Sequence, residues 1–314
     1  TDGIEACKKS GADVIVAVGG GSSIDTAKGI SIVMTNPDRA DIVSLNGASN
    51  TVNRGMPVIA LPTTSGTAAE VTINYVITDE EREVKMVCVD PHDIPIMAIV
   101  DSDLMATMPK SLASATGMDA LCHAVEGYTC LQKNPLSDAY AVTAVRMISD
   151  NLKKAVIDGS DTEARIAMAN AALMAGISFS NSMVGIVHGI GHALGAVCRI
   201  PHGTAMNILL PHCMMYNLDV CRENYADLLF WLAGPEIYSA TPEKDRAEAC
   251  IRFIRNLSEE LHELCGLPLT LSEAGASEDD FEKVAETSLR DGANLVNPKY
   301  VDRDTILSIL RKAY

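Results

Sequence analysis

The stretch ADVIVAVGGGSSIDTAK, residues 12–28, decides the class of fold that this sequence predicts. Its first part, Ala12–Val18, is a short run of β-branched and small residues, which is typical of a buried strand. The glycines of Gly19–Gly21 then predict a tight turn, and Ile24–Lys28 has the pattern of the first turns of a helix. A strand, a glycine turn and a helix are the repeating unit of α/β folds.

The glycine turn is also a candidate phosphate site. Backbone N–H groups and the helix dipole converge at such a turn, and Gly20 and Gly21 would let a pyrophosphate approach the backbone without interference from a Cβ atom. The spacing is, however, neither that of a GxGxxG fingerprint nor that of a Walker loop. The turn could equally need glycine for a positive φ, with Ser22 or Ser23 as an ordinary helix N-cap. From this loop alone, both interpretations remain open.

Two further apolar runs, Val58–Leu61 and Ile96–Val100, predict buried parallel strands, because they are continuous rather than alternating. The loop TTSGT at residues 63–67 follows the first of them and supplies hydroxyl groups and backbone donors. The carboxyl ends of parallel strands meet at one edge of a sheet, where the ligands of open α/β sheets bind. This second loop therefore favours phosphate binding at the glycine turn.

Beyond Pro109 the hydrophobic pattern takes the helical period, with Ala, Leu and Met in place of the β-branched runs. We therefore predict an α/β domain over residues 1–108 and a mostly helical domain over residues 109–314. From Ile166 to Leu218 the only charged side chain is Arg199, so this stretch must be largely buried. Its Asn, Ser, His and Gly residues suit the centre of a protein domain better than a membrane.

Length and composition limit the functional classes. The 314 residues suit one large globular enzyme or two packed domains. A net charge of −16 would repel nucleic acid and anionic membranes, so neither is an expected partner. Nine cysteines without a CxxC pair predict a reduced, cytoplasmic protein. The sequence begins at Thr1 without a secretory signal, and we expect its true beginning to lie upstream.

Potential metal ligands gather in the second half of the chain. Asp119 and His123 would project from one face of a helix, and His188 and His192 repeat the same spacing. The first pair alone is explained more simply by a helix-dipole aspartate and a core histidine. With His202, however, three histidines occur within fifteen residues of almost uncharged chain, and each buried imidazole needs a partner. A divalent cation would satisfy several of them, and Fe²⁺, Zn²⁺ and Mn²⁺ suit these ligands equally.

The other cysteines and histidines have simpler interpretations. Cys122 and Cys198 flank the candidate ligands but lack ligand spacing, so we expect them to be small buried hydrophobic residues. His92 and His262 have no comparable neighbourhood and are expected at the surface or in structural roles. A structural role is also expected for His212.

Together these motifs resemble the iron-dependent (group III) alcohol dehydrogenases along essentially the whole chain. The markers are the glycine turn with Ser22, PTTSGTAAE at residues 62–70, GMDALCHAVE at residues 117–126, and the segments around His188 and His202. The resemblance implies an N-terminal Rossmann-like, dehydroquinate synthase-like α/β domain followed by an all-helical metal-binding domain, with the active site between them. It also implies that the first domain is incomplete at its front.

The resemblance implies roles for individual residues. Fe²⁺, or Zn²⁺ as the alternative, would be held by Asp119, His123, His188 and His202. His192 would lie near the nicotinamide as the catalytic residue that relays a proton, and Phe179 would border the substrate pocket. NAD, with NADP not excluded, would be bound by Gly20, Gly21, Ser22, Thr63, Thr64, Thr67, Asn74, Lys85 and Leu104.

The activity that the resemblance implies is hydride transfer between a nicotinamide cofactor and a small aldehyde or alcohol, with Fe²⁺ as a Lewis acid. Lactaldehyde and propane-1,2-diol are the expected pair. One alternative keeps the fold and changes the substrate to glycerol, propane-1,3-diol or butanol, or the reaction to that of a dehydroquinate synthase. Another alternative is a truncated chain that binds metal and oligomerises without activity. A homodimer or higher homo-oligomer is expected.

Overall fold

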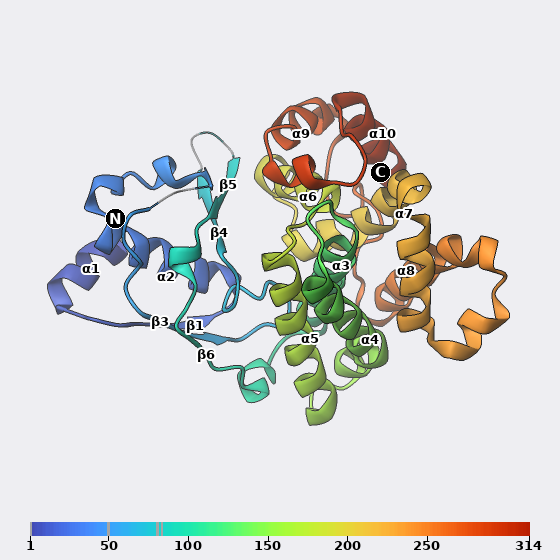
Figure 1. Ribbon diagram of the computed structural model, residues 1–314, viewed down its shortest axis with the longest axis horizontal. Helices are drawn as coiled ribbons and strands as arrows, with labels where there is room; N and C mark the ends of the chain where they lie inside the picture. The colour runs from blue at the N-terminus through green and yellow to red at the C-terminus, as the bar shows by residue number, and fades with distance from the viewer. Residues whose placement is uncertain (1, 49–50, 80–81, 83) are drawn as a thin grey trace.

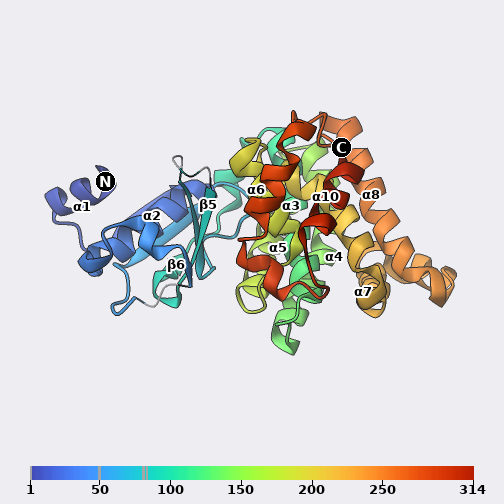
Figure 2. The same cartoon turned by 90° about the horizontal axis from the view of Figure 1, so that it is seen from above.

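The computed structural model describes residues 2–48, 51–79, 82 and 84–314. An α/β part, which ends before Lys110, lies beside a larger helical part along the longest axis of the molecule (Figure 1). The view from above shows the same two parts side by side (Figure 2). The change from strands to helices therefore falls at Pro109, where the hydrophobic pattern changes.

The first sheet contains the three predicted strands. They are β1 (Ile15–Gly19), β3 (Val58–Pro62) and β6 (Met97–Ala98), which run parallel in the order β1-β3-β6. In the register, Ile15 pairs with Val58, so both strands end at the same edge. The helix α2 (Gly21–Thr35) follows β1 and packs against this sheet.

The expectation that these strands are buried on both faces is wrong. Ala17 and Ala60 are buried under α2, whereas Val16 and Val18 are 58% and 56% exposed and Ile96 is 54% exposed. In a strand, successive side chains point to opposite faces, and α2 covers only one face of this sheet. A continuous apolar run thus has one face that remains open to solvent.

A second sheet was not predicted. It consists of β2 (Gly47–Ala48), β4 (Asn74–Asp79) and β5 (Val84–Val89), with β5 in the middle, parallel to β2 and antiparallel to β4. The strands β4 and β5 form a hairpin, and their apolar runs at residues 75–77 and 86–89 are short and bounded by polar residues. This sheet connects the two parts of the molecule, because β5 contacts helix α6 of the helical part.

A buried lysine attaches α2 to the second sheet. The Nζ atom of Lys28 donates hydrogen bonds to the carbonyl oxygens of Thr72 at 2.6 Å and Asn74 at 2.8 Å, and lies 3.9 Å from Oδ1 of Asp93. Burial lowers the pKa of Lys28, and the Asp93 carboxylate opposes this shift. Because an unpaired buried charge is costly, these contacts orient α2, and with it the glycine turn, against β4.

Short elements complete the α/β part. They are α1 (Asp2–Ser10) and the 3₁₀ turns η1 (Pro37–Arg39), η2 (Ile42–Leu45), η3 (Pro91–Asp93) and η4 (Ser102–Met105). Asp41, Asp90 and Asp101 cap the last three of these turns, since each side chain accepts a hydrogen bond from a backbone N–H at the start of the turn.

The helical part is arranged around α3, whose middle is almost entirely buried. Its helices are α3 (Lys110–Thr129), α4 (Pro135–Ile157), α5 (Thr162–Ser180), α6 (Ile186–Val197), α7 (His202–Ala240), α8 (Arg246–Cys265), α9 (Phe281–Ser288) and α10 (Arg303–Ala313). Three short turns join them: η5 (Glu243–Asp245), η6 (Glu278–Asp280) and η7 (Gly292–Val296). Helices α4, α5 and α7 pack around α3.

The charge-poor stretch forms the interior, as predicted. Residues 166–218 make up most of α5, all of α6 and the first half of α7, and most of their side chains are buried. Among the residues that the structure describes, no helix is long and apolar enough to cross a membrane. The lack of charge in this stretch therefore reflects packing inside the helical part.

His212, on α7, is half-buried, and its protonation should affect stability. Burial, together with the charges of Arg255 and Lys312, lowers its pKa from 6.5 to about 4. The pKa of this histidine is lower in the folded state than in the unfolded state. Its contribution to stability is therefore complete at a pH above its pKa in the unfolded state, and it is lost as the pH falls towards its pKa in the folded state.

We therefore expect His212→Gln to lose less stability than the wild type on acidification. The free energy of unfolding, measured with urea, should fall between about pH 7.5 and about pH 5 by roughly 1 kcal/mol less in the variant than in the wild type. This figure allows for solvent screening. The same substitution at His262, on α8, controls for the loss of an imidazole elsewhere. Parallel pH profiles for the wild type and His212→Gln would contradict this prediction.

Candidate active site

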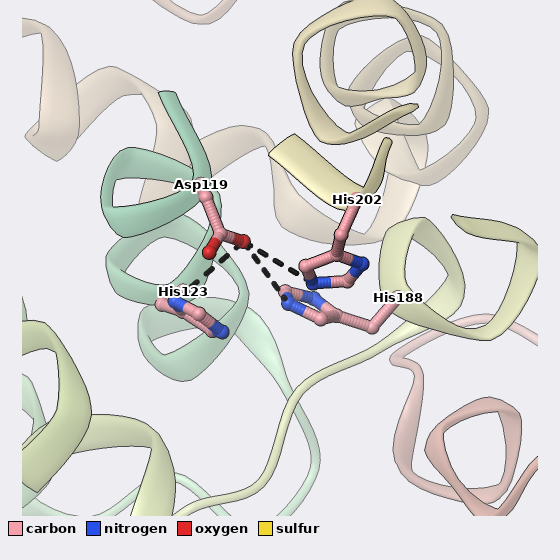
Figure 3. Close-up of side chains that lie close together, drawn as sticks. All are labelled: Asp119, His123, His188 and His202. Carbon is pink, nitrogen blue, oxygen red and sulfur yellow. Dashed lines mark ion pairs between the residues drawn. The ribbon is translucent and has the colours of Figure 1, made fainter. Parts of the chain in front are cut away.

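Four predicted ligand residues converge between three helices of the helical part (Figure 3). Asp119 and His123 lie on successive turns of α3, His188 is near the start of α6, and His202 is the first residue of α7. The Oδ1 atom of Asp119 lies 3.4 Å from Nε2 of His202 and 3.9 Å from both Nε2 of His188 and Nδ1 of His123. One ligand atom from each residue lies within 4.8 Å of all the others.

The chemistry of this group fits a cation. Oδ1 of Asp119, Nδ1 of His123 and Nε2 of His188 are buried and have no hydrogen-bond partner among the residues that the structure describes. Burial lowers the pKa of His123 to about 3 and that of His188 and His202 well below the usual range. The imidazoles are therefore neutral and can each offer a lone pair. Buried polar atoms are normally paired, so a bound cation would account for these exceptions.

Glu126 is part of this site and was not predicted to have a role. Its Oε2 atom lies 2.5 Å from Nδ1 of His188, and its Oε1 accepts a hydrogen bond from the backbone N–H of Val187 at 2.8 Å. Because Gly185 provides no side-chain cap, Glu126 both caps α6 and orients the His188 ring. Burial raises the pKa of Glu126 to about 7, although backbone N–H groups oppose the shift.

A signal for Glu126 was present in the sequence. It follows His123 by three residues and Asp119 by seven, so helical geometry places all three on one face of α3. Cys122 also lies near His188, with its Sγ 3.9 Å from Nδ1. Burial raises the pKa of this thiol well above its usual value, which agrees with the prediction of a small buried residue. Cys198 departs from the same prediction, because it is only half-buried.

His192 lies beside the four-residue group without belonging to it. Its ring is stacked on that of His202, with centroids 5.3 Å apart, and its Nδ1 lies 2.8 Å from Oδ2 of Asp291. Burial would raise the pKa of Asp291, but His192 and the backbone N–H of Ala293 lower it overall. Asp291 thus holds the His192 ring in place, and no sequence motif pointed to this contact.

An apolar wall borders the group on the side of His123. The ring of Phe179 is stacked on that of His123, with centroids 4.2 Å apart and an interplanar angle of 14°. Phe179 forms a small buried cluster with Val184 and Ala293. The predicted substrate-pocket residue therefore contacts one of the candidate ligands directly.

The two predicted cofactor loops touch each other at the end of the first sheet. The backbone N–H of Thr63 donates to the carbonyl oxygen of Gly19 at 3.0 Å. A Cβ added to Gly20 would lie 3.2 Å from Oγ1 of Thr64, and one added to Gly21 would lie 2.9 Å from Oγ1 of Thr67. Ser22 lies in the first turn of α2 beside them. The predicted proximity of the two loops is confirmed.

The structure supports one part of the turn-geometry explanation of the glycine turn and contradicts another part. Only Gly19 has a positive φ, of 151°, whereas Gly20 has a φ of −78°. The N-cap of α2 is Gly20, and no side chain among the described residues caps this helix, so the alternative of a serine N-cap is wrong. A Cβ on Gly20 or Gly21 would instead crowd the threonines of the second loop. That the backbone donors at the start of α2 bind a phosphate stays a prediction.

The remaining predicted cofactor residues lie on different elements. Lys85 extends from β5 to α6, where a Cβ at Gly195 would lie 2.9 Å from its Nζ. Burial lowers the pKa of Lys85, and the charges of Asp119 and Asp25 oppose this shift. Asn74 begins β4 with a buried, unpaired Oδ1, and Leu104 lies in η4, which packs against α5. The structure thus brings Lys85 towards the metal ligands and places Leu104 on a separate segment.

Comparison with known proteins agrees with this architecture. The model of the iron-containing alcohol dehydrogenase family matches residues 1–102, and that of the C-terminal region of the Fe-containing alcohol dehydrogenase family matches residues 113–314. The chain is 42% identical to lactaldehyde reductase of Escherichia coli (strain K12) over 313 residues, which is 100% of this chain and 80% of that protein. It is 41% identical over 313 residues to the 1,3-propanediol dehydrogenase of Klebsiella pneumoniae, covering 100% of this chain and 79% of that enzyme.

Solved structures show the same arrangement. The crystal structure of a 1,3-propanediol oxidoreductase superposes with a TM-score of 0.93 at 40% identity, covering 100% of this chain and 80% of that one. This chain therefore has its α/β part and its helical part in the same arrangement and the same order as that solved structure. The chain belongs to the iron-containing alcohol dehydrogenase family and has that family's fold.

Proposed function

We propose that this protein is a metal-dependent, NAD-linked alcohol dehydrogenase that interconverts a small aldehyde and its alcohol, with NADP as the alternative cofactor. The observation that carries the proposal is the group of buried, unpaired ligand atoms around Oδ1 of Asp119. In this proposal Fe²⁺, with Zn²⁺ as the alternative, is held by Asp119, His123, His188 and His202. The metal, when bound, supplies Lewis-acid polarisation of the substrate oxygen.

The chain's own residues hold the reacting groups in place. Phe179, which is stacked on His123, gives the substrate an apolar wall and excludes water from that side. Asp291 fixes the His192 tautomer that carries its proton on Nδ1, which leaves Nε2 free to accept or give a proton. His192 is therefore proposed as the residue that moves a proton between the site and solvent.

Cofactor binding is proposed for the two loops at the end of the first sheet. Residues 1–108 would bind the dinucleotide and residues 109–314 the metal. The N-terminus of α2 offers backbone donors to the pyrophosphate, and hydroxyl groups of the second loop lie beside it. The proposed set is Gly20, Gly21, Ser22, Thr63, Thr64, Thr67, Asn74, Lys85 and Leu104.

Lactaldehyde and propane-1,2-diol are the proposed substrate pair, supported by 42% identity to a lactaldehyde reductase. A second candidate is propane-1,3-diol, supported by 41% identity to 1,3-propanediol dehydrogenases. The test follows NADH and NADPH oxidation with lactaldehyde, propanal, glyceraldehyde and 3-hydroxypropanal, on protein loaded with Fe²⁺ or Zn²⁺. We expect the highest kcat/KM with lactaldehyde and NADH. Absence of turnover in metal-loaded protein would favour a chain that binds metal without catalysis.

Replacing Glu126 by Gln should weaken metal binding by about 10- to 100-fold, because an amide orients and polarises His188 less well than a carboxylate. Competition with a chromogenic chelator would measure the change for Fe²⁺ and Zn²⁺. Glu286→Gln, at an exposed position of α9, is the matched control and should leave the affinity unchanged. Equal affinities for Glu126→Gln and the wild type would show that Glu126 only caps α6.

A further inference from the structure

A second pocket opens on the surface of the helical part, and it shares no residue with the candidate active site. It has a volume of about 240 Å³. Its lining consists of four aromatic side chains and one carboxylate: Tyr128, Asp227, Phe230, Trp231 and Tyr238. Aromatic residues make up only 4% of the sequence, and Trp231 is its single tryptophan, so this grouping is unusual for the chain.

A kink in α7 assembles the aromatic walls. Gly234 has a φ of 82° and a ψ of 168°, and Pro235 follows it, so the last turns of α7 change direction. The ring of Tyr238 therefore meets Phe230 edge to face, with centroids 5.5 Å apart, and Phe230 meets Trp231 in the same way at 5.1 Å. The three rings are therefore in edge-to-face contact, an arrangement that aromatic pairs prefer to a face-to-face sandwich.

The pocket carries one negative charge. Asp227 precedes Phe230 and Trp231 by three and four residues, so it lies on their face of α7. Burial raises the pKa of Tyr128, at the end of α3, and the negative charge of the nearby Asp227 adds to this shift. Within the part of the chain that the structure describes, no lysine or arginine forms an ion pair with Asp227. Its carboxylate is therefore available to an external cation.

The rings of this pocket already attract cations of the chain itself. The Nζ atom of Lys133 lies 4.4 Å from the centre of the Tyr128 ring, and the guanidinium carbon of Arg246 lies 3.9 Å from that of Tyr238. Lys133 is in turn neutralised by Asp138 at 2.7 Å. These two cations occupy faces of the tyrosines, so a ligand would meet the exposed parts of Phe230 and Trp231, whose rings also contact each other edge to face.

We propose that this pocket binds a small alkylated ammonium ion, with its charge beside Asp227 and its alkyl groups against Phe230 and Trp231. Aromatic walls with a carboxylate recognise such ions because a quaternary ammonium group is weakly hydrated and its charge spreads over its methyl groups. A metal ion would lose too much hydration in an aromatic pocket, and a neutral ligand would not use Asp227. The net charge of −16 further concentrates cations near the surface.

Because Trp231 is the only tryptophan, intrinsic fluorescence reports on the pocket directly. Choline and tetramethylammonium are titrated into the full chain, with NaCl at equal ionic strength and with 3,3-dimethylbutan-1-ol as the uncharged analogue of choline. We expect a saturable change with both cations and binding about tenfold weaker for the uncharged analogue. No saturable change, or equal affinity for the uncharged analogue, would overturn the proposal.

Variants that each lose one negative charge distinguish the effect of Asp227 from that of the overall charge of the protein. Asp227→Asn should weaken choline binding by about three- to tenfold. Glu286→Gln removes the same charge from an exposed position of α9 outside the pocket lining, and it should leave binding unchanged. Circular dichroism checks that both variants fold. Equal losses in both variants would also overturn the proposal.

Discussion

Replacing Asp119 by Ala is expected to abolish metal binding and to lower kcat/KM for aldehyde reduction by at least about 10³-fold. Oδ1 of Asp119 is the one atom that faces all three candidate histidine ligands. Without it, the remaining imidazoles are neutral and give a cation no compensating negative charge. Metal content by plasma mass spectrometry and NADH oxidation would be measured on the same preparation.

The control for this prediction is a matched substitution and a metal-reloading experiment. Asp150→Ala, at an exposed position of α4, removes an aspartate without touching the site. Chelation should inactivate the wild type and Asp150→Ala, and added Fe²⁺ or Zn²⁺ should restore both. Asp119→Ala should not recover. Activity that survives both chelation and the Asp119 substitution would refute the metal-dependent mechanism.

Replacing Gly21 by Val should raise the KM for NADH by about 100-fold, which corresponds to about 2.7 kcal/mol of binding free energy. A Cβ at this position would already lie 2.9 Å from both Oγ1 and Cγ2 of Thr67, so the larger side chain must push the second loop away. It would also fill the space through which a pyrophosphate approaches the N-terminus of α2. Steady-state kinetics with varied NADH would measure the effect.

This substitution is informative only if the helical part remains intact. Metal content should therefore stay at the wild-type level in Gly21→Val, since the candidate ligands lie on α3, α6 and α7. Gly159→Val is the matched control, because a Cβ there has no neighbour closer than 4.0 Å. An unchanged KM in Gly21→Val would place the cofactor elsewhere in the molecule.

Local sequence patterns were sufficient to predict features that lie within a single helix, strand or turn. The spacing of Asp119 and His123 predicted their common direction, because residues four apart lie on one face of a helix. The runs at β1 and β3 predicted parallel strands, and the glycine turn predicted the start of α2. The β4–β5 hairpin was missed because its apolar runs, residues 75–77 and 86–89, are short and no glycine-rich loop follows either strand.

Such patterns could not predict contacts between segments that are distant in the sequence. His192 meets Asp291, 99 residues further along the chain, and His188 meets Glu126, 62 residues earlier. Asp291 lies in no motif, and the spacing of Glu126 from His123 indicates only its direction on α3. The packing of α3, α6 and η7 brings each carboxylate to its histidine. Likewise, the exposed face of β1 follows from which side α2 covers.

The sequence by itself therefore determined the order of an α/β part and a helical part, the glycine turn and the residue types of the candidate metal site. These features depend on periodicity and spacing within single elements, which repeat at fixed intervals along a chain. Only the tertiary structure decided how the four ligand atoms face one another, which carboxylates support the histidines, and how a kink at Gly234 gathers an aromatic pocket. Such arrangements depend on how distant helices pack against one another, and this packing leaves no periodic pattern in the sequence.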